Sequence, residues 1–191
     1  MNLFFYDVDT KYVNYLKAAE IAKRGFTRVP DIEYKNERKM VCGVVLEIND
    51  FKYYVPVSSY KIKQPNNILI RLDDDKFNPV KGSLRFNYMF PINDACISKR
   101  DFSNENPGRR EFLRRQWIYC NSIETAIREM AENTYYSVIS GNGISLLNAS
   151  CDFKLLEKSL QDLCSLNTPL FFSILVSPAP SHTPPAPGSP H

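Results

Sequence analysis

Five residues have side chains suited to chemistry on a phosphodiester, and they are Tyr34, Lys39, Ser58, Ser59 and Lys61. Cleavage of RNA without a metal ion uses the 2′-hydroxyl as nucleophile and needs a base, an acid and donors to the charged phosphorane. Lysines and hydroxyls can be those donors, and a lysine whose pKa is lowered by a neighbouring lysine could transfer a proton. The alternative is that the lysines guard strand edges and the serines form turns.

A predicted β-hairpin should bring most of these residues together. Residues 40–57 contain two strand-like runs rich in β-branched residues, and Asn49-Asp50 predicts the turn between them. Because Lys39 precedes the first strand and Ser58 follows the second, antiparallel pairing places both at one end of the hairpin, near Lys61.

The remaining pattern predicts an α+β fold, with one strongly curved antiparallel sheet and helices laid on it. Residues 1–164 form the expected domain, and the proline-rich segment 165–191 is expected to be a disordered tail or a remnant of cloning. Further strands are expected at 3–8, 67–72, 83–88 and 94–98. A first helix is expected from Thr10, capped by Asp9, to about Arg24. One helix or two are expected from Pro107 to about Ile139, and a last helix from Asp152 to Cys164.

Basic residues outside this group could contact a nucleic-acid backbone. Several lie between Lys61 and Arg100 among tyrosines and phenylalanines that could stack on bases, although a half-buried sheet also alternates in this way. Arginines at the start of the long predicted helix oppose the helix dipole, which indicates an anionic partner or simply a solvated face. The residues assigned to RNA binding are Lys35, Arg38, Lys63, Arg85, Arg110, Arg114 and Arg115.

Composition argues against several other classes of site. The five cysteines form no CxxC pair, so zinc-ligand spacing is absent, and we expect buried free thiols in a reducing cytoplasm. The two histidines, His182 and His191, lie in the last ten residues, which argues against histidine-based catalysis and most transition-metal sites. We therefore expect neither a metal nor a cofactor.

Charge and hydropathy say little about partners. The net charge is +3, so a basic surface must come from local clustering. We see no signal peptide and no apolar run of the roughly 20 residues that span a bilayer. The expected location is the cytoplasm, without a membrane partner.

Several segments, taken in order from about residue 3 to 163, resemble the ToxN/AbiQ family. They are Phe5-Tyr6 with Tyr12–Lys17, then Gly43–Ile48, Tyr54–Lys61, Asn87–Ile92 and Cys151–Glu157. The resemblance implies a sheet or barrel core similar to the MazF/Kid toxins, decorated by helices. It also implies a metal-independent, sequence-selective endoribonuclease toxin of a type III toxin–antitoxin system, leaving 2′,3′-cyclic phosphate and 5′-hydroxyl ends.

The same resemblance implies partners and residue roles. The antitoxin would be a folded repeat RNA, processed by the toxin and bound with it in a closed ring-like complex, and the substrates would be cellular or phage RNA in a bacterium. The family's catalytic positions fall on Tyr34, Lys39, Ser58, Ser59 and Lys61. One extra residue after Tyr34 leaves Arg38 as an alternative to Lys39. Ser59 and Lys61 would bind the scissile phosphate, and Tyr34 would position the nucleotide. Ser58 or Lys39 would help to activate the 2′-hydroxyl or to protonate the leaving oxygen.

Two other classes of function fit the same residues. A non-catalytic RNA-binding module would use the basic groove without cleavage. A protein-interaction domain would dock its arginine-rich helix on an acidic partner.

Overall fold

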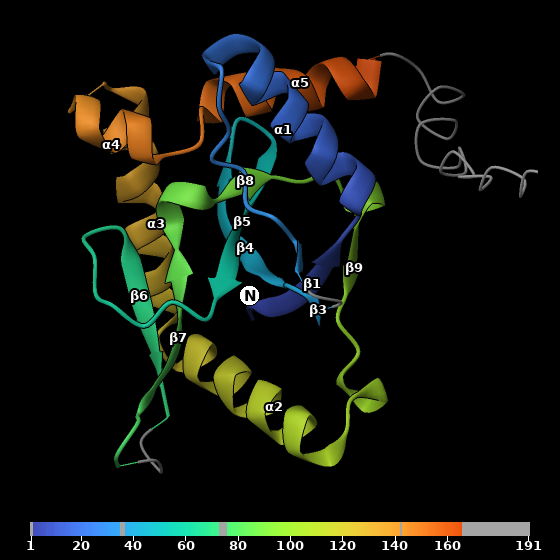
Figure 1. Cartoon of the computed structure of the whole chain (residues 1–191), viewed down its shortest axis with the longest axis vertical. Coiled ribbons are helices and arrows are strands. Elements are labelled where there is room, and N and C mark those ends of the chain that lie inside the picture. The colour runs from blue at the N-terminus through green and yellow to red at the C-terminus, as the bar shows by residue number, and fades with distance from the viewer. Residues whose placement is uncertain (1, 35–36, 73–75, 142, 166–191) are drawn as a thin grey trace, which may run out of the picture.

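The computed structural model describes residues 2–34, 37–72, 76–141 and 143–165, and every structural statement concerns these residues (Figure 1). The predicted tail beyond residue 165 and Lys35, one of the predicted RNA-binding residues, lie outside them.

Seven strands form one antiparallel sheet with the order β6-β7-β5-β4-β1-β9, and β8 pairs with β5 beside this path. The predicted antiparallel sheet is therefore confirmed. A closed barrel is not: no described pairing joins β6 to β9, and β6 packs against helix α2, where the Tyr119 hydroxyl donates to the Leu69 carbonyl oxygen at 3.1 Å. The strands are β1 (Phe4–Val8), β4 (Val41–Ile48), β5 (Phe51–Ser58), β6 (Asn67–Arg71), β7 (Val80–Arg85), β8 (Phe90–Pro91) and β9 (Ile97–Lys99), and a separate pair is formed by β2 (Glu33–Tyr34) and β3 (Glu37–Arg38).

The central hairpin, β4 with β5, forms as its sequence predicts. Its turn residues Asn49 and Asp50 have φ angles of 48° and 65°, the left-handed conformation that a tight hairpin turn requires. The register shifts between Gly43 and Leu46, where the strand bulges. A Cβ on Gly43 would lie 2.2 Å from the Tyr54 ring, so only glycine fits this contact.

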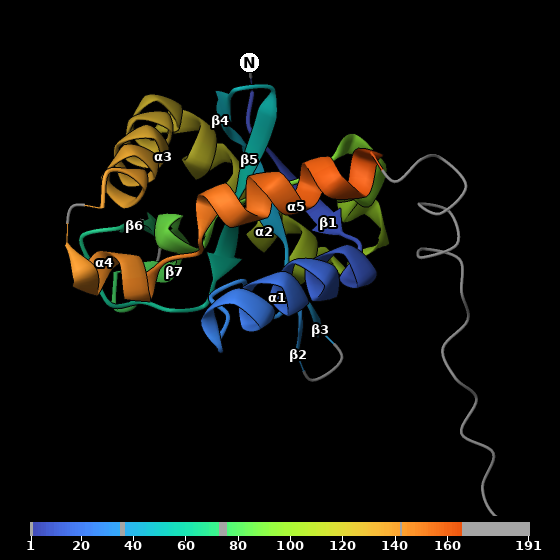
Figure 2. The same ribbon diagram turned by 90° about the horizontal axis from the view of Figure 1, so that it is seen from above.

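Five helices cover the sheet. Figures 1 and 2 show α1 (Thr10–Arg24) beside α5 (Phe153–Ser165) at one end of the molecule, and Figure 1 shows α2 (Pro107–Ser122) at the other. The long helical pattern resolves into two helices, because α3 (Glu124–Ile139) begins after a break at Ile123. The predicted caps are confirmed, since the Asp9 carboxylate accepts from Lys11 N at 2.7 Å and Asp152 accepts from Leu155 N at 3.1 Å.

Two local predictions were wrong, and one helix was missed. The strand expected at 83–88 ends at Arg85 and continues as a 3₁₀ turn, Phe86–Tyr88, whose first amide is held by the Asn66 carbonyl. The strand expected at 94–98 begins with the 3₁₀ turn Asp94–Cys96, because Asn93 caps the Ala95 amide at 2.9 Å. The short helix α4 (Ile144–Ala149) had no counterpart in the prediction.

The core contains one buried carboxylate with aromatic partners. Glu157 accepts hydrogen bonds from the hydroxyls of Tyr53 at 2.9 Å and Tyr135 at 2.6 Å, and from Lys154 Nζ at 2.9 Å. This cluster joins β5, α3 and α5. Four cysteines are buried as expected and Cys164 is exposed, all as free thiols. No described helix combines the length and the apolar character that crossing a membrane would require.

Candidate functional site

The hairpin brings Lys39 and Ser58 to the same end of the sheet, as predicted. The Val57 amide donates to the Met40 carbonyl at 3.0 Å, which extends the pairing one step beyond Val41 and Pro56. Lys39 and Ser58 then stand between two adjoining clefts and line both of them. The two clefts therefore form one groove with this pair in the middle.

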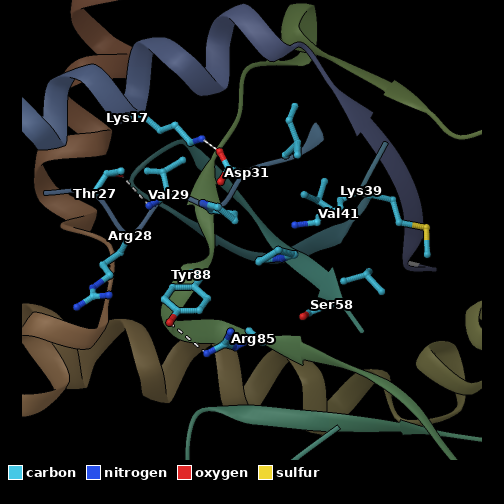
Figure 3. A pocket seen from close by; sticks show the side chains of 15 residues that line it. Lys17, Thr27, Arg28, Val29, Asp31, Lys39, Val41, Ser58, Arg85 and Tyr88 are labelled. Atoms are coloured by element: carbon cyan, nitrogen blue, oxygen red, sulfur yellow. Dashed lines mark hydrogen bonds and ion pairs between the residues drawn. The ribbon is translucent and has the colours of Figure 1, made fainter. Parts of the chain in front are cut away.

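The first cleft has a volume of about 350 Å³ and lies between the hairpin, the segment after α1 and the end of β7. In Figure 3, Asp31 and Lys17 lie on one side of it, and Arg85 and Tyr88 face them from the other. Its described lining is Lys17, Thr27, Arg28, Val29, Pro30, Asp31, Ile32, Lys39, Met40, Val41, Pro56, Val57, Ser58, Arg85 and Tyr88.

The second cleft, of about 230 Å³, continues the groove toward α2. It adds two arginines and a lysine to the shared pair, together with the exposed hydroxyl of Ser59. Its described lining is Arg38, Lys39, Met40, Val57, Ser58, Ser59, Lys81, Arg109, Phe112 and Gln116.

The groove is strongly cationic. Among the described residues that line it, seven are lysines or arginines and one is a carboxylate, Asp31, which is ion-paired with Lys17. A cleft lined by one sign of charge raises the local potential well above that of the whole surface. The modest net charge of the chain thus conceals a site suited to a polyanion.

Hydrogen bonds fix the turn that carries the two serines. The Ser58 hydroxyl oxygen accepts from the Tyr60 amide at 3.2 Å, and the buried Ser83 hydroxyl donates to the Tyr60 carbonyl at 2.7 Å. Gly82 packs directly against this turn, because a Cβ there would lie 2.4 Å from the Ser58 carbonyl oxygen. The serine positions therefore depend on two β7 residues that carry no chemistry themselves.

The loop beyond the turn is organised by buried Asn67. Its side chain accepts from the Gln64 amide and donates to the Ile62 carbonyl, both at 2.9 Å. Lys63 donates to the Asn67 carbonyl, so this predicted RNA-binding residue has a local partner. Lys61 is exposed and lines neither cleft, so its contact with the phosphate stays a prediction.

Arg85 lies between two tyrosine rings at the edge of the first cleft. Its guanidinium carbon is 4.9 Å from the Tyr60 ring centroid and 4.2 Å from that of Tyr88, and Nη2 donates to the Tyr88 hydroxyl at 3.1 Å. Its Nε is buried without a hydrogen-bond partner among the described residues. Arg85 therefore lines the first cleft with a guanidinium that both tyrosine rings hold in place.

A buried carboxylate positions the segment after α1, which forms the wall of the first cleft opposite Arg85. Glu20 is fully buried at the end of α1. Its two oxygens accept from Arg24 Nη1 at 3.0 Å, Thr27 Oγ1 at 2.8 Å and the amides of Arg28, Val29 and Asp152 at 2.6, 3.3 and 2.6 Å. These bonds join the wall segment to α1 and to the start of α5.

The arginines of α2 differ in where they lie. Arg109 lines the second cleft. Arg110 instead donates to the carbonyls of Ser103 and Glu105, and Arg114 forms a two-point ion pair with Glu111 at 2.8 and 2.9 Å. Like Arg115, these two lie outside the described lining of both clefts. Their roles in RNA binding stay predictions.

The remaining predicted residues are placed only in part. The Tyr34 backbone pairs with Glu37 in the two-stranded sheet, and Arg38, the alternative to Lys39, lines the second cleft. Prediction from sequence missed Lys17, Glu20, Arg28 and Asp31, because the position of their segment beside the hairpin depends on tertiary contacts. Within the described ranges, no cluster of three or more His, Cys, Asp or Glu residues could hold a metal ion.

Comparison with known proteins gives a consistent result. The ToxN toxin family, of type III toxin–antitoxin systems, matches residues 4–161. The endoribonuclease AbiQ of Lactococcus lactis subsp. lactis is 31% identical over 167 residues, which cover 82% of this chain and 87% of that protein.

Solved structures agree with the sequence match. The structure of AbiQ, a lactococcal anti-phage endoribonuclease of a type III system, superposes with a TM-score of 0.70 at 28% identity, over 87% of this chain and all of that one. A toxin selectively inhibited by a non-coding RNA pseudoknot superposes with a TM-score of 0.72 at 22% identity, over 85% of this chain and 98% of that one, and so shares the fold.

Proposed function

The chain belongs to the ToxN family of type III toxin–antitoxin systems, and on this basis we propose that the groove at Lys39 and Ser58 is where it cuts RNA. It is an endoribonuclease toxin, as its named relatives are. The observation that carries the assignment of the site is the position of Lys39 and Ser58 between two cation-lined clefts. A strand of RNA laid along both clefts would pass its phosphates over this pair.

The proposed reaction is transesterification within the RNA. The 2′-oxygen attacks the adjacent phosphorus and loses its proton to a base, while the bond from phosphorus to the 5′-oxygen breaks and that oxygen gains a proton. The products are a 2′,3′-cyclic phosphate and a 5′-hydroxyl. No metal ion takes part in this scheme.

The hydrogen bonds around Ser58 favour one role for it. Its oxygen already accepts the Tyr60 amide, so its own proton remains able to point at a non-bridging phosphate oxygen. Exposed Ser59 adds a second donor at the same turn, and Lys61, two residues later in the chain, is proposed to bind the phosphate with it. Lys39 is then the group proposed to transfer a proton, and Tyr34 is proposed to position the nucleotide.

The same groove is proposed to bind the antitoxin. A toxin of the same fold is inhibited by an RNA pseudoknot, and a folded repeat RNA would compete with substrate for these cations. We propose that toxin and processed RNA close into a ring, and that release of the toxin arrests growth during phage infection. The likeness of the sheet to MazF and Kid remains part of this proposal.

The test uses purified protein and total bacterial RNA in excess EDTA, with the new ends mapped. Wild type should give 2′,3′-cyclic phosphate ends. Lys39→Met should lower the single-turnover rate by roughly 10²–10⁴-fold, the usual range for losing proton transfer. Ser58→Ala should lower it by roughly 10²–10³-fold, the range for losing one hydrogen bond to the developing charge. Exposed Lys158, outside both clefts, gives the matched control Lys158→Met, which should cut normally.

Two results would contradict the assignment. Normal cleavage by Lys39→Met and Ser58→Ala would move the catalytic centre elsewhere. RNA that stays intact but bound by folded wild type would favour the non-catalytic RNA-binding module.

A further inference from the structure

The first cleft has apolar residues among its charged ones. Its described lining includes Val29, Pro30, Ile32, Val41, Pro56 and Val57. Apolar surface suits the face of a nucleobase, whereas phosphates gain nothing from it. Tyr88, held by Arg85, adds an aromatic ring at the side of the same cleft. The lining therefore fits a base that has turned out of the RNA backbone.

Asp31 is the one carboxylate among the described residues that line either cleft. Its side chain is 70% exposed, and Lys17 donates to its Oδ1. Its Oδ2 has no partner within the described part of the chain. A carboxylate repels phosphate, so its place in this groove needs another reason than backbone binding. Figure 3 shows it across the cleft from Tyr88 and Arg85, where the edge of a base in the cleft would lie.

We propose that Asp31 selects the base beside the scissile phosphate, favouring adenine, cytosine or guanine over uracil. This inference rests on the proposed function of the groove. An ionised carboxylate only accepts hydrogen bonds, and those three bases present an exocyclic amino group as donor. Uracil presents a single N–H between two carbonyl oxygens, and the carboxylate repels those two oxygens. Lys17 holds one carboxylate oxygen in place, and the other accepts from the base.

The second cleft differs from the first in its charge and completes the path. Arg38, Lys81 and Arg109 line it without any carboxylate among its described residues. It therefore binds the backbone on the far side of Lys39 and Ser58, without selecting a base. The groove is thus divided into a base-reading half and a phosphate-binding half.

The experiment compares RNA oligonucleotides that differ only in the bases flanking the cut. The measured quantity is the ratio of kcat/KM for an amino-bearing base to that for uracil at each position. Wild type should favour the amino-bearing base roughly tenfold or more at one flanking position, and Asp31→Ala should bring that ratio close to one. Asp31→Asn should raise cleavage at uracil, because its amide both accepts from N3–H and donates to a carbonyl oxygen.

Asp94→Asn is the matched control. Asp94 is also 70% exposed and also pairs with a lysine, Lys52 at 2.7 Å, but it lies outside the described lining of both clefts. Its variant should keep the wild-type ratio. The affinities of the same oligonucleotides, blocked by 2′-O-methylation at the cut, are measured in parallel, so that base selection is read even without cleavage.

The outcomes separate the two proposals. If the kcat/KM ratio between an amino-bearing base and uracil is the same in Asp31→Ala as in wild type, at whatever overall rate, the role of Asp31 is overturned. Base-selective binding that depends on Asp31, combined with no cleavage by wild type, supports Asp31 and overturns the proposed reaction. Loss of selectivity in Asp94→Asn as well would show a general charge effect and would also overturn the role of Asp31.

Discussion

Two buried carboxylates, Glu20 and Glu157, have different tasks in this protein. Glu20 accepts mainly from backbone amides and from Arg24, and so fixes the course of a loop that lines the candidate site. Glu157 accepts from two tyrosine hydroxyls and a lysine, and so joins three elements of the core. Burial alone therefore does not distinguish a residue that shapes a site from one that stabilises the core. The chemical nature of the donors does.

The largest effect is expected from Glu20→Gln. The change leaves Arg24, whose side chain is 15% exposed, without its charged partner and turns an amide NH₂ toward groups that are themselves donors. Breaking such a buried pair costs about 3–5 kcal/mol, measurable as a lower free energy of unfolding in urea. At urea concentrations below the unfolding midpoint, the rate of RNA cleavage should also fall. The reason is that the cleft wall with Arg28 and Asp31 loses its hydrogen bonds to the Glu20 carboxylate. Full activity in the folded variant would show that Glu20 is purely structural.

A smaller effect is expected from Glu157→Gln. The amide oxygen can still accept one tyrosine hydroxyl, and Lys154, 52% exposed, can turn to solvent. The cost should be about 1–3 kcal/mol, the penalty for one poorly satisfied buried group. Cleavage per folded molecule should stay at the wild-type rate. A loss of cleavage equal to that of Glu20→Gln would remove the proposed difference between the two carboxylates.

Thiol labelling also tests the difference between Glu20 and Glu157, and the effect expected there is smaller. In native wild type only Cys164 should react quickly with a disulfide reagent at pH 8, because the other four thiols are buried. Burial, and then the charges of Asp9 and Cys164, raise the pKa of Cys96 to about 12, which further suppresses its thiolate. Glu20→Gln should make buried Cys151 reactive, because the backbone amide of neighbouring Asp152 loses its carboxylate acceptor. Glu157→Gln should leave Cys151 protected, and equal labelling in both variants would contradict this.

The smallest effect concerns alkaline pH. Burial, followed by the charge of Glu157, raises the pKa of Tyr53 well above its ordinary value. Above the unfolded value of about 10, the unfolded chain releases this proton while the folded chain keeps it, so the stability it contributes is present below pH 10 and lost as pH rises further. Tyr53→Phe should therefore show a shallower fall in unfolding free energy between pH 9 and about 11. If the unfolding free energy of Tyr53→Phe falls as steeply as that of wild type, then other tyrosines cause the loss of stability at alkaline pH.

Local signals made much of the fold predictable. The Asn49-Asp50 turn and the aspartate caps of α1 and α5 act within a few residues, and each formed where expected. Closure of the sheet was not predictable in this way, because it depends on whether two distant strands meet. The 3₁₀ turn at Phe86–Tyr88 had a strand-like composition that its tertiary contacts overrode.

The candidate site was predictable on one side only. Hairpin geometry placed Lys39 beside Ser58, since strand pairing relates residues nearly 20 positions apart. The wall with Arg28 and Asp31 comes from a loop without a periodic pattern, and the buried side chain of Glu20 holds it to α1 and to the start of α5. Nothing in the local sequence states where that loop packs.

Gly82 has a consequence for genetics. Every amino-acid change at this position adds a Cβ, which would lie 2.4 Å from the Ser58 carbonyl oxygen and displace the turn that presents both serines. Bacteria that survive expression of the toxin without the proposed RNA antitoxin should therefore often carry missense mutations in this codon. Escape from the toxin would collect at a residue that has no side chain at all.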